Sequence, residues 1–378
     1  MKTVVIADYA RTPFTVAKKG ALAGTRPDEM AAQLVKKFVA RSGINAADIE
    51  DLLLGCAIPE GEQGLNMARL VVLMAGLPQT VGGQTINRFC GSSMQGIHTA
   101  AGAIQMGAGE AFICAGVESM TRVPMTGFNL FPHPDLARSL PGAYMGMGDT
   151  AENVARQWGI SRAEQETFAY QSHQKAAKAQ AAGFFKDEII PVETKKGTVD
   201  SDGCIRTDTS PEALAQLKPA FTAEGTVTAG TSSPLTDGAA ATIVCSAEYA
   251  DKHGLKPFAR LASIAIAGVA PEIMGIGPIE ASRKALARAG IKATALDVVE
   301  LNEAFAAQAL ACIRDLDLDP AKVNIDGGAI AIGHPLGASG ARITGKAASL
   351  LKRTGGRYAL ATMCIGGGQG IATVLEAL

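Results

Sequence analysis

Several features that would mark a specialised class of protein are missing from this sequence of 378 residues. Acidic and basic side chains nearly cancel, giving a formal net charge of -1, so nothing favours nucleic acid or an anionic membrane as the main partner. No apolar run is long enough to form a helix across a bilayer. The composition, 47% hydrophobic and 19% charged with 5% aromatic residues, is that of an ordinary globular protein with room for two or three domains.

The cysteines lack the spacing of a disulfide framework or a zinc site. There are seven, an odd number, and no two of them form a C-x-x-C pair. We therefore expect free thiols, no metal and a reducing compartment. The opening residues 1–8 read as a strand that runs into polar residues, and not as a signal peptide, so we expect a cytoplasmic protein. Five cysteines are expected to be structural: Cys56, Cys114, Cys204, Cys245 and Cys312.

Glycine is abundant, and strand-like segments alternate with helix-like ones along most of the chain. This alternation is typical of an α/β protein, and it predicts a mainly parallel sheet covered by helices on both faces. The clearest helix is 27–42, which begins with a proline and ends before Gly43. The predicted strands are 3–7, 51–58, 111–116, 241–246, 258–267, 297–301, 323–325, 358–363 and 371–376. Further predicted helices are 64–74, 90–107, 278–289, 303–315 and 340–353.

The alternation stops after Glu118. Residues 121–140 carry turn residues without clear periodicity, and residues 188–230 are polar and irregular. Between them, Ser161 and Glu164 form a capping box that predicts the start of a helix. We therefore divide the chain into three parts: an N-terminal half of residues 1–120, completed by 240–256, an inserted domain of residues 121–239, and a C-terminal half of residues 257–378.

Cys90 is the first candidate for chemistry. It ends a short apolar run, and the small residues Gly91, Ser92 and Ser93 follow it at the predicted start of a helix. Unpaired backbone N–H groups and the positive end of the helix dipole lie at such a position, and both favour the nucleophilic thiolate over the thiol. Taken alone, Cys90 is equally compatible with an inert buried cysteine.

An internal repeat places a histidine where the first copy has this cysteine. Near Cys90 the order is strand, Cys-Gly-Ser-Ser, small-residue helix, strand, Cys114-Ala-Gly-Val-Glu. Near His334 the order is strand, His-Pro-Leu-Gly, small-residue helix, strand, Cys364-Ile-Gly-Gly-Gly. Two copies of one α/β unit, packed about a pseudo-twofold axis, would bring the two helix starts face to face. Generic similarity between α/β units is the alternative.

The local sequence makes three more residues candidates for the site. His334 lies in a glycine-rich segment, 327–340, where an imidazole is able to accept the Cys90 proton. Cys364 enters a glycine turn whose N–H groups form a candidate oxyanion hole, and its thiol is a candidate general acid and base. Each has a structural alternative: a histidine satisfied by backbone groups, and a buried cysteine at a strand end. Asn302, before a predicted helix, reads first of all as an N-cap.

Together these segments closely resemble the thiolase family, and the matches run in order over nearly the whole chain. They are Asn87-Arg88-Phe89-Cys90-Gly91-Ser92-Ser93-Met94-Gln95, Gly225-Thr226-Val227-Thr228-Ala229-Gly230-Thr231-Ser232-Ser233, Asn302-Glu303-Ala304-Phe305, Gly327-Gly328-Ala329-Ile330-Ala331-Ile332-Gly333-His334-Pro335 and Cys364-Ile365-Gly366-Gly367-Gly368-Gln369-Gly370. The resemblance implies a layered α-β-α-β-α fold of two pseudo-twofold related halves, with an inserted loop domain that binds coenzyme A.

The resemblance also implies a role for each site residue. Cys90 is the nucleophile that becomes acylated, and His334 is the base that activates it. Cys364 protonates the departing acetyl-CoA enolate, or removes the α-proton in the condensing direction. His334 and a water held by Asn302 form one oxyanion hole, and the backbone N–H groups of Cys90 and Gly366 form the second.

Coenzyme A is implied as a co-substrate, with no tightly bound cofactor and no metal. By resemblance Ser233 contacts its pantetheine arm, and Met147 and Phe305 are taken as further coenzyme A contacts. From the sequence alone, Met147 reads as a packing residue. The family also implies a homodimer or homotetramer, and some members dock with a multifunctional β-oxidation subunit.

The sequence around Cys90 resembles that of the degradative type of thiolase, which cleaves 3-ketoacyl-CoA in fatty acid β-oxidation. Biosynthetic acetoacetyl-CoA thiolases often carry histidine where Gly146 stands. The sequence therefore predicts a 3-ketoacyl-CoA thiolase, acetyl-CoA C-acyltransferase. The first alternative is an acetyl-CoA C-acetyltransferase on the same scaffold, and the second is a non-catalytic CoA-binding protein that kept the fold.

Overall fold

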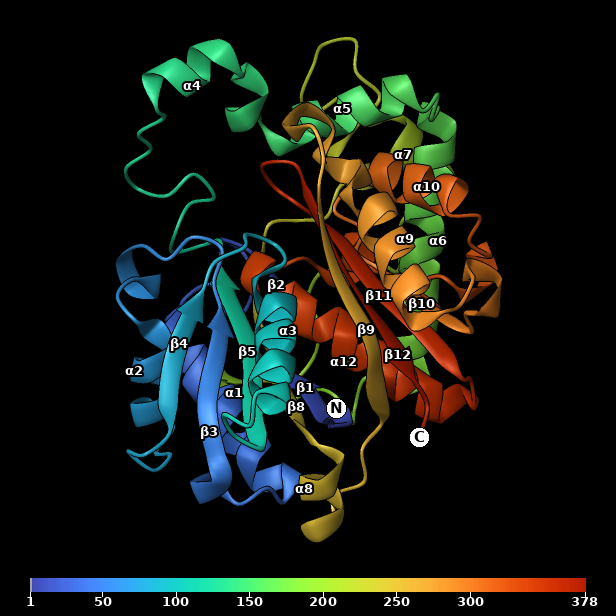
Figure 1. Cartoon of the computed structure of the whole chain (residues 1–378). Helices are drawn as coiled ribbons and strands as arrows, with labels where there is room; N and C mark the ends of the chain where they lie inside the picture. Colours follow the sequence, from blue (N-terminus) through green and yellow to red (C-terminus); the bar gives the residue numbers. More distant parts are fainter. Residues whose placement is uncertain (1) are drawn as a thin grey trace.

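Two α/β halves share one sheet in the computed structural model, which describes residues 2–378 (Figure 1). The strands run in the order β10-β11-β12-β9-β1-β8-β5-β3-β4, and a short strand, β2, pairs with β8. Their bounds are β1 (Val4–Arg11), β2 (Thr15–Val16), β3 (Ile49–Gly55), β4 (Gly82–Ile86), β5 (Ala111–Ser119), β8 (Thr236–Ser246), β9 (Ala259–Gly268), β10 (Val298–Leu301), β11 (Tyr358–Ile365) and β12 (Gln369–Glu376). The halves meet where β1 pairs with β9 through only two residue pairs, Val5 with Arg260 and Ile6 with Ala259.

The strand order of the first half is repeated in the second. In the first half β3 and β5 are parallel, β5 and β8 antiparallel, and β8 and β1 antiparallel. In the second half β10 and β11 are parallel, β11 and β12 antiparallel, and β12 and β9 antiparallel. The repeat seen in the sequence is therefore a repeat of topology.

The prediction of a mainly parallel sheet is wrong. Only the pairs β3–β4, β3–β5 and β10–β11 are parallel. Three residues join β11 to β12, a connection that only an antiparallel pair allows. In the first half β8 returns from a long excursion and runs antiparallel to both of its long neighbours, β1 and β5.

The strand predicted at 323–325 is also absent from the described residues. Its counterpart in the first half is β4, which lies parallel to β3, whereas here a single parallel bridge joins Val323 to Val299. Asn324 has a positive φ of 46°, which breaks extended backbone. Its side-chain amide bonds instead to the backbone of Leu301, accepting from its N–H at 3.0 Å and donating to its carbonyl at 2.8 Å.

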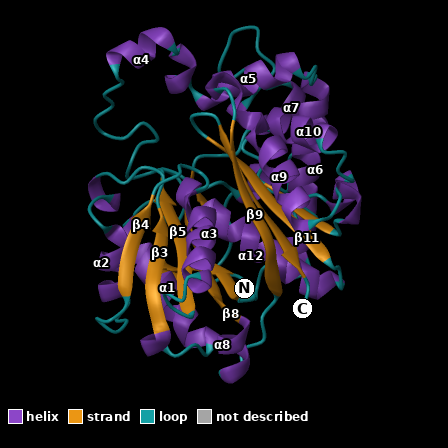
Figure 2. Cartoon of the chain, viewed as in Figure 1, coloured by secondary structure: helices purple, strands orange, loops and turns teal. Residues whose placement is uncertain are grey.

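Helices form three layers around the two parts of the sheet, as Figure 2 shows. One outer layer is α1 (Pro27–Ser42) and α2 (Met67–Met74), the central layer is α3 (Ser92–Gln105) and α12 (Leu336–Thr354), and the other outer layer is α9 (Gly277–Ala289) and α10 (Ala306–Asp315). Three separate clusters of buried apolar residues fill the spaces between these layers and the sheet. The α/β class is confirmed, and the layers run α-β-α-β-α.

The chain between β5 and β8 forms small elements of its own: α4 (Pro134–Ser139), α5 (Met147–Gln157), β6 (Val192–Thr194), β7 (Gly197–Val199), α7 (Pro211–Ala215) and the long α6 (Arg162–Ala181). The predicted capping box of Ser161 and Glu164 opens α6. Helix α6 packs against α10 and α11 (Ala329–Ile332) of the second half, whereas α4 stands away from the body (Figure 1). Short helix α8 (Ala247–Lys252) follows β8.

A buried carboxylate attaches this segment to both halves. Glu188 accepts from Arg11 Nε of β1 at 2.8 Å and from Lys346 Nζ of α12 at 2.8 Å. Arg11 also pairs with Asp202, and Lys346 also pairs with Asp326. Because all of these side chains are buried, their charges depend on one another for solvation.

Across residues 2–378, no helix is both long and apolar enough to cross a membrane, and no three His, Cys, Asp or Glu side chains gather in a way that would hold a metal ion. All seven cysteines are free and buried.

Candidate active site

Cys90 lies in a tight turn between β4 and α3. The helix begins at Ser92, two residues later than predicted, because Phe89 adopts a left-handed conformation with φ of 42°. Two side chains hold this turn: Asn87 Oδ1 accepts from the Phe89 N–H at 2.8 Å, and Ser92 Oγ accepts from the Arg88 N–H at 2.9 Å. The turn places the Cys90 side chain, 9% exposed, just before the first turn of α3.

The first turns of α3 and α12 are in backbone contact. A Cβ built on Gly340 would lie 2.4 Å from the backbone nitrogen of Met94, so only glycine fits there. The Ala341 N–H of α12 donates to Ser93 Oγ of α3 at 2.8 Å. This contact brings together the segments that carry Cys90 and His334, which are 244 positions apart in the sequence.

The hydrogen bonds of His334 fix which nitrogen is free to act as a base. Ser339 Oγ lies 2.6 Å from Nδ1 and donates its own proton to the Pro335 carbonyl at 3.0 Å, so Nδ1 carries hydrogen and donates to Ser339. Nε2 is then an acceptor, facing Asn302 Nδ2 at 3.3 Å. Burial, with the charge of Arg342, lowers the pKa of His334 to about 3, so the imidazole is neutral at pH 7.

Asn302 is not an N-cap, because α10 begins only at Ala306, after Phe305. It directly follows β10, and its N–H donates to the Thr362 carbonyl of β11 at 3.0 Å, two residues before Cys364. Its Oδ1 is buried and has no partner among residues 2–378. An unpaired amide oxygen beside His334 is suited to accept a hydrogen bond from a water or a substrate group.

Cys364 is the penultimate residue of β11, and the turn Gly366–Gly368 follows the strand, with φ of 77° and 85° at Gly367 and Gly368. The backbone N–H of Gly366 lowers the pKa of the Cys90 thiol, and the Phe89 ring lies 3.7 Å from a Cβ built on Gly366. Burial, and then the neighbouring charge of Cys90, raise the pKa of the Cys364 thiol. A Cβ built on Gly91, which follows Cys90, would lie 2.5 Å from the Ile365 side chain, which follows Cys364, so the two cysteines come from adjoining turns.

The expectation that Cys90 favours the thiolate is wrong for the free protein. Burial raises its pKa to about 11, and the backbone N–H groups of Gly366 and Cys90 offset only part of this effect. The thiol therefore needs a base before it reacts, and neutral His334 is of the right kind.

The three residues expected to contact coenzyme A surround the same place. Met147, at the start of α5, packs in one cluster with Phe305 and Cys364. Its sulfur lies 3.5 Å from a Cβ built on Gly366. The Ser233 N–H donates to the Ala304 carbonyl at 3.0 Å, next to Phe305.

Three supporting residues were missed by the sequence analysis. Besides Ser339, Thr236 Oγ1 accepts from the His334 N–H at 3.0 Å. The buried Glu303 carboxylate accepts from the Ser172 hydroxyl, the Asn324 amide and the Ile330 N–H, and so holds the glycine-rich segment that carries His334. Of these, only Ser339 had a usable signal, since it follows His334 by about one helical turn in a run of small residues.

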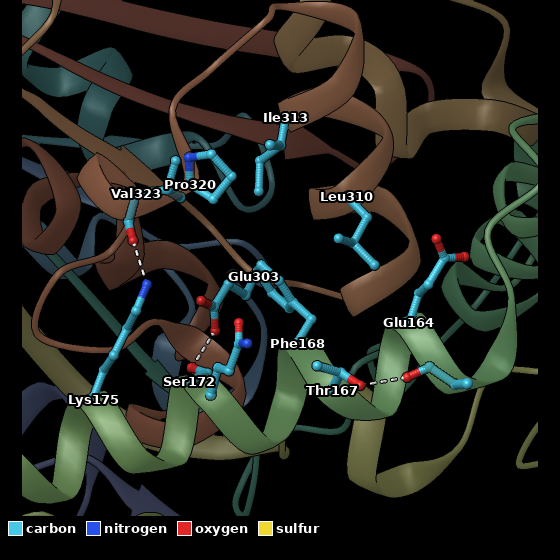
Figure 3. A pocket seen from close by; sticks show the side chains of 12 residues that line it. Glu164, Thr167, Phe168, Ser172, Lys175, Glu303, Leu310, Ile313, Pro320 and Val323 are labelled. Carbon is cyan, nitrogen blue, oxygen red and sulfur yellow. Dashed lines mark hydrogen bonds between the residues drawn. The ribbon is translucent and has the colours of Figure 1, made fainter.

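A cavity of about 340 Å³ lies outside this cluster, between α6 and α10. Figure 3 shows Phe168, Leu310 and Ile313 on its walls and Lys175 and Glu303 facing it. Two of its charged groups already have partners: Lys175 donates to the Val323 carbonyl at 2.9 Å, and Glu303 accepts from Ser172 at 2.7 Å. The cavity thus borders the residues that hold the His334 segment in place. It lacks the unpaired polar groups that are found in the Cys90 cluster.

Comparisons with known proteins agree with this arrangement. The sequence matches the family descriptions "Thiolase, N-terminal domain" over residues 4–248 and "Thiolase, C-terminal domain" over residues 255–377. It is 48% identical to the 3-ketoacyl-CoA thiolase of Bacillus subtilis (strain 168), over all of both chains. It is also 48% identical to the 3-ketoacyl-CoA thiolase of Vibrio vulnificus (strain YJ016), again over all of both chains. The crystal structure of the Bacillus anthracis acetyl-CoA acetyltransferase superposes with a TM-score of 0.91 at 40% identity, covering 100% of this chain and 99% of the other.

Proposed function

The chain belongs to the thiolase family, and from that premise we infer that it is an acyltransferase that cleaves 3-ketoacyl-CoA with CoA. The products are acetyl-CoA and an acyl-CoA shortened by two carbons, and the reaction is reversible. As parts of the same proposal, the enzyme acts in fatty acid β-oxidation, and it is an oligomer in the cytoplasm.

The first half of the reaction acylates Cys90. His334 Nε2 takes the Cys90 proton, and the thiolate attacks C3 of the substrate. The N–H groups of Cys90 and Gly366 hold the resulting oxyanion. The C2–C3 bond then breaks, and the electron pair moves onto the thioester oxygen of acetyl-CoA as an enolate, beside His334 and Asn302.

The second half restores the enzyme. Cys364 gives its proton to C2 of the enolate, and acetyl-CoA leaves. The remaining Cys364 thiolate takes the proton of the incoming CoA thiol, whose sulfur attacks the acyl group on Cys90. When the tetrahedral intermediate collapses, the shortened acyl-CoA leaves and Cys90 recovers its proton from His334.

One observation carries this proposal: the turn of Cys90 packs against the turn that follows Cys364, with Ile365 against Gly91 and Phe89 against Gly366. A nucleophile, a charge-stabilising donor and a second thiol at one place are what carbon–carbon cleavage through a thioester requires. Met147 and Ser233 border this place, which supports binding of coenzyme A by the inserted domain of residues 121–239, and Phe305 of the C-terminal half lies beside them.

Intact mass after mixing with a 3-ketoacyl-CoA tests the proposal. The native protein is expected to gain the mass of the shortened acyl group, and Cys90→Ala is expected to gain none. A native protein that binds CoA but forms no adduct would identify a non-catalytic relative.

A second candidate is an acetyl-CoA acetyltransferase, which the name of the superposed Bacillus anthracis structure favours. Turnover measured across acyl lengths separates the two. Cleavage of long-chain 3-ketoacyl-CoA supports the first, and activity on acetoacetyl-CoA alone would replace it with the second.

A further inference from the structure

One side chain links the two parts of the candidate oxyanion hole. Arg88 lies two residues before Cys90, and its Nε donates to Gln95 Oε1 of α3 at 3.0 Å. Its Nη1 donates to Gln369 Oε1 at 2.8 Å. Gln369 is the first residue of β12 and directly follows the turn Gly366–Gly368. No other hydrogen bond between side chains of residues 2–378 joins the 87–91 turn to the 365–369 turn.

The distance between these turns matters because each supplies one donor. The Cys90 N–H belongs to the first half, and the Gly366 N–H belongs to the second. Donors stabilise an oxyanion only when they lie about 2.7–3.1 Å from it, and a misplacement of about 1 Å costs on the order of 10² in rate. The glycine turn has no side chain of its own to fix its position until Gln369.

We propose that Arg88 is a positioning residue, whose guanidinium spans from Gln95 to Gln369 and sets the spacing of the Cys90 and Gly366 N–H groups. The proposal rests on the proposed function, since it concerns the oxyanion on acylated Cys90. It does not depend on the charge of Arg88. A planar guanidinium donates in two fixed directions, whereas a lysine ammonium keeps the charge but is a single point donor that cannot span both partners.

The test is the carbonyl stretch of the acyl-enzyme. The protein is acetylated with carbonyl-¹³C acetyl-CoA, and isotope-edited difference infrared spectroscopy reads the thioester carbonyl on Cys90. In the native protein both N–H groups polarise this carbonyl and lower its frequency. In Arg88→Lys and in Gln369→Ala the frequency is expected to rise, and kcat to fall by about 10- to 100-fold with little change in KM.

Three comparisons keep the result specific. Gln369→Glu, whose carboxylate still accepts from Arg88, is expected to keep the native frequency. The double variant Arg88→Lys/Gln369→Ala is expected to be no slower than the slower single variant, because both changes break one link. Arg283→Lys, at an exposed arginine on α9, controls for the substitution itself.

The outcomes separate this proposal from the proposed function. If the native protein acquires no acetyl group on Cys90, the proposed function fails. If the native protein is acetylated and both Arg88→Lys and Gln369→Ala keep the native frequency and kcat, only the role of Arg88 is overturned. An Arg88→Lys protein that does not fold leaves Gln369→Ala, which removes the same link from the other side, to decide.

Discussion

In the first half of the molecule the chain leaves β5 at Ser119 and returns only at Thr236, whereas in the second half the corresponding step from β11 to β12 takes three glycines. The strands on either side have the same order and directions in both halves. The long connection carries Met147 and Ser233, which border the candidate site, and the short one carries the Gly366 N–H. The repeated scaffold therefore gains its asymmetry in its connections, which supply different parts of the candidate site.

The segments before the two central helices, α3 and α12, also differ between the halves. In the first half the turn before α3 carries Cys90, and in the second half the segment before α12 carries His334. Neither half contains a nucleophile, a base and both candidate oxyanion donors. Four experiments test this division of roles.

The largest effect is expected from replacing the thiol of the second half. Cys364→Ala should lower the rate of cleavage by about 10²–10⁴, because no general acid remains for the enolate. Transfer of an acyl group from acyl-CoA to Cys90 should persist, as read by intact mass. The matched control is Cys114→Ala, at the corresponding strand of the first half. Cys114 is fully buried in the core beneath α3, so catalysis should be unchanged. Equal losses in both variants would show that the halves are not specialised as described.

The next effect concerns the imidazole. Between the pKa of about 3 for His334 and about 11 for Cys90, nearly all of the protein holds a Cys90 thiol beside a neutral imidazole. Acylation of Cys90 by an acyl-CoA, in which His334 takes the proton as the sulfur attacks, should therefore be flat from about pH 5 to 9 in the native protein. In His334→Gln it should be slower at pH 7 and rise about tenfold per pH unit, because the proton must now go to solvent.

His98→Gln is the control for this experiment. Burial lowers the pKa of His98 to about 3 as well, but this imidazole bonds to Thr373 at 2.8 Å and lies apart from Asn302. Its replacement should leave the acylation profile flat. A flat profile in His334→Gln would remove His334 from the role of base.

The third experiment asks whether the segment between β5 and β8 is fixed to one half or to both. Glu188→Ala removes a buried carboxylate from between Arg11 of the first half and Lys346 of the second. The expected cost is about 3–5 kcal/mol in the free energy of unfolding, measured by denaturant titration. Glu280→Ala, at the exposed pair with Arg283, should cost less than about 1 kcal/mol. Similar values for the two would contradict the buried connection.

The smallest effects compare glycines of the two central helices. Gly340→Ala forces α12 away from the Met94 backbone and should cost about 1–3 kcal/mol, with loss of activity because the adjoining segments carry Cys90 and His334. Gly102 of α3 has no neighbour within 4 Å, so Gly102→Ala should stabilise the protein by about 0.4–1 kcal/mol. Thermal denaturation and cleavage rates measure both. A tolerated Gly340→Ala would contradict the close crossing of α3 and α12.

Local signals predicted local structure well. The helix Pro27–Ser42 has the predicted bounds, because its proline opens it and Gly43 adopts the left-handed conformation that closes it. The capping box at Ser161 is equally local. Strand direction is not, since alternation of helices and strands did not indicate the short hairpin from β11 to β12, and the partners of β8 lie far away in sequence. The predicted strand at 323–325 failed because the Asn324 side chain takes the place of backbone pairing.

The candidate site likewise has features that local sequence predicts and features that depend on distant parts of the chain. Cys90, His334 and Cys364 were found from their sequence context and the family resemblance. The structure brings the turn of Cys90 against the turn that follows Cys364, and it brings His334 to Asn302. The protonation state of Cys90 was not predictable, because it depends on burial, which elements from both halves create. Thr236 and Glu303 had no signal, since their partners lie in distant segments.

The narrow junction between the halves determines where the chain can be opened and rejoined. Arg260 of β9 pairs with Val5 on one side and with Glu376 on the other, so the two ends of the chain are separated by the width of a single strand. Two strand spacings are about 10 Å, a gap that a short linker would bridge. The protein should accept circular permutation, with new ends opened at the exposed segment after α8, so that the second half is synthesised before the first. The order in which the two halves leave the ribosome would then be reversed. The way in which the segments of Cys90 and Cys364 come together in the folded protein would stay the same.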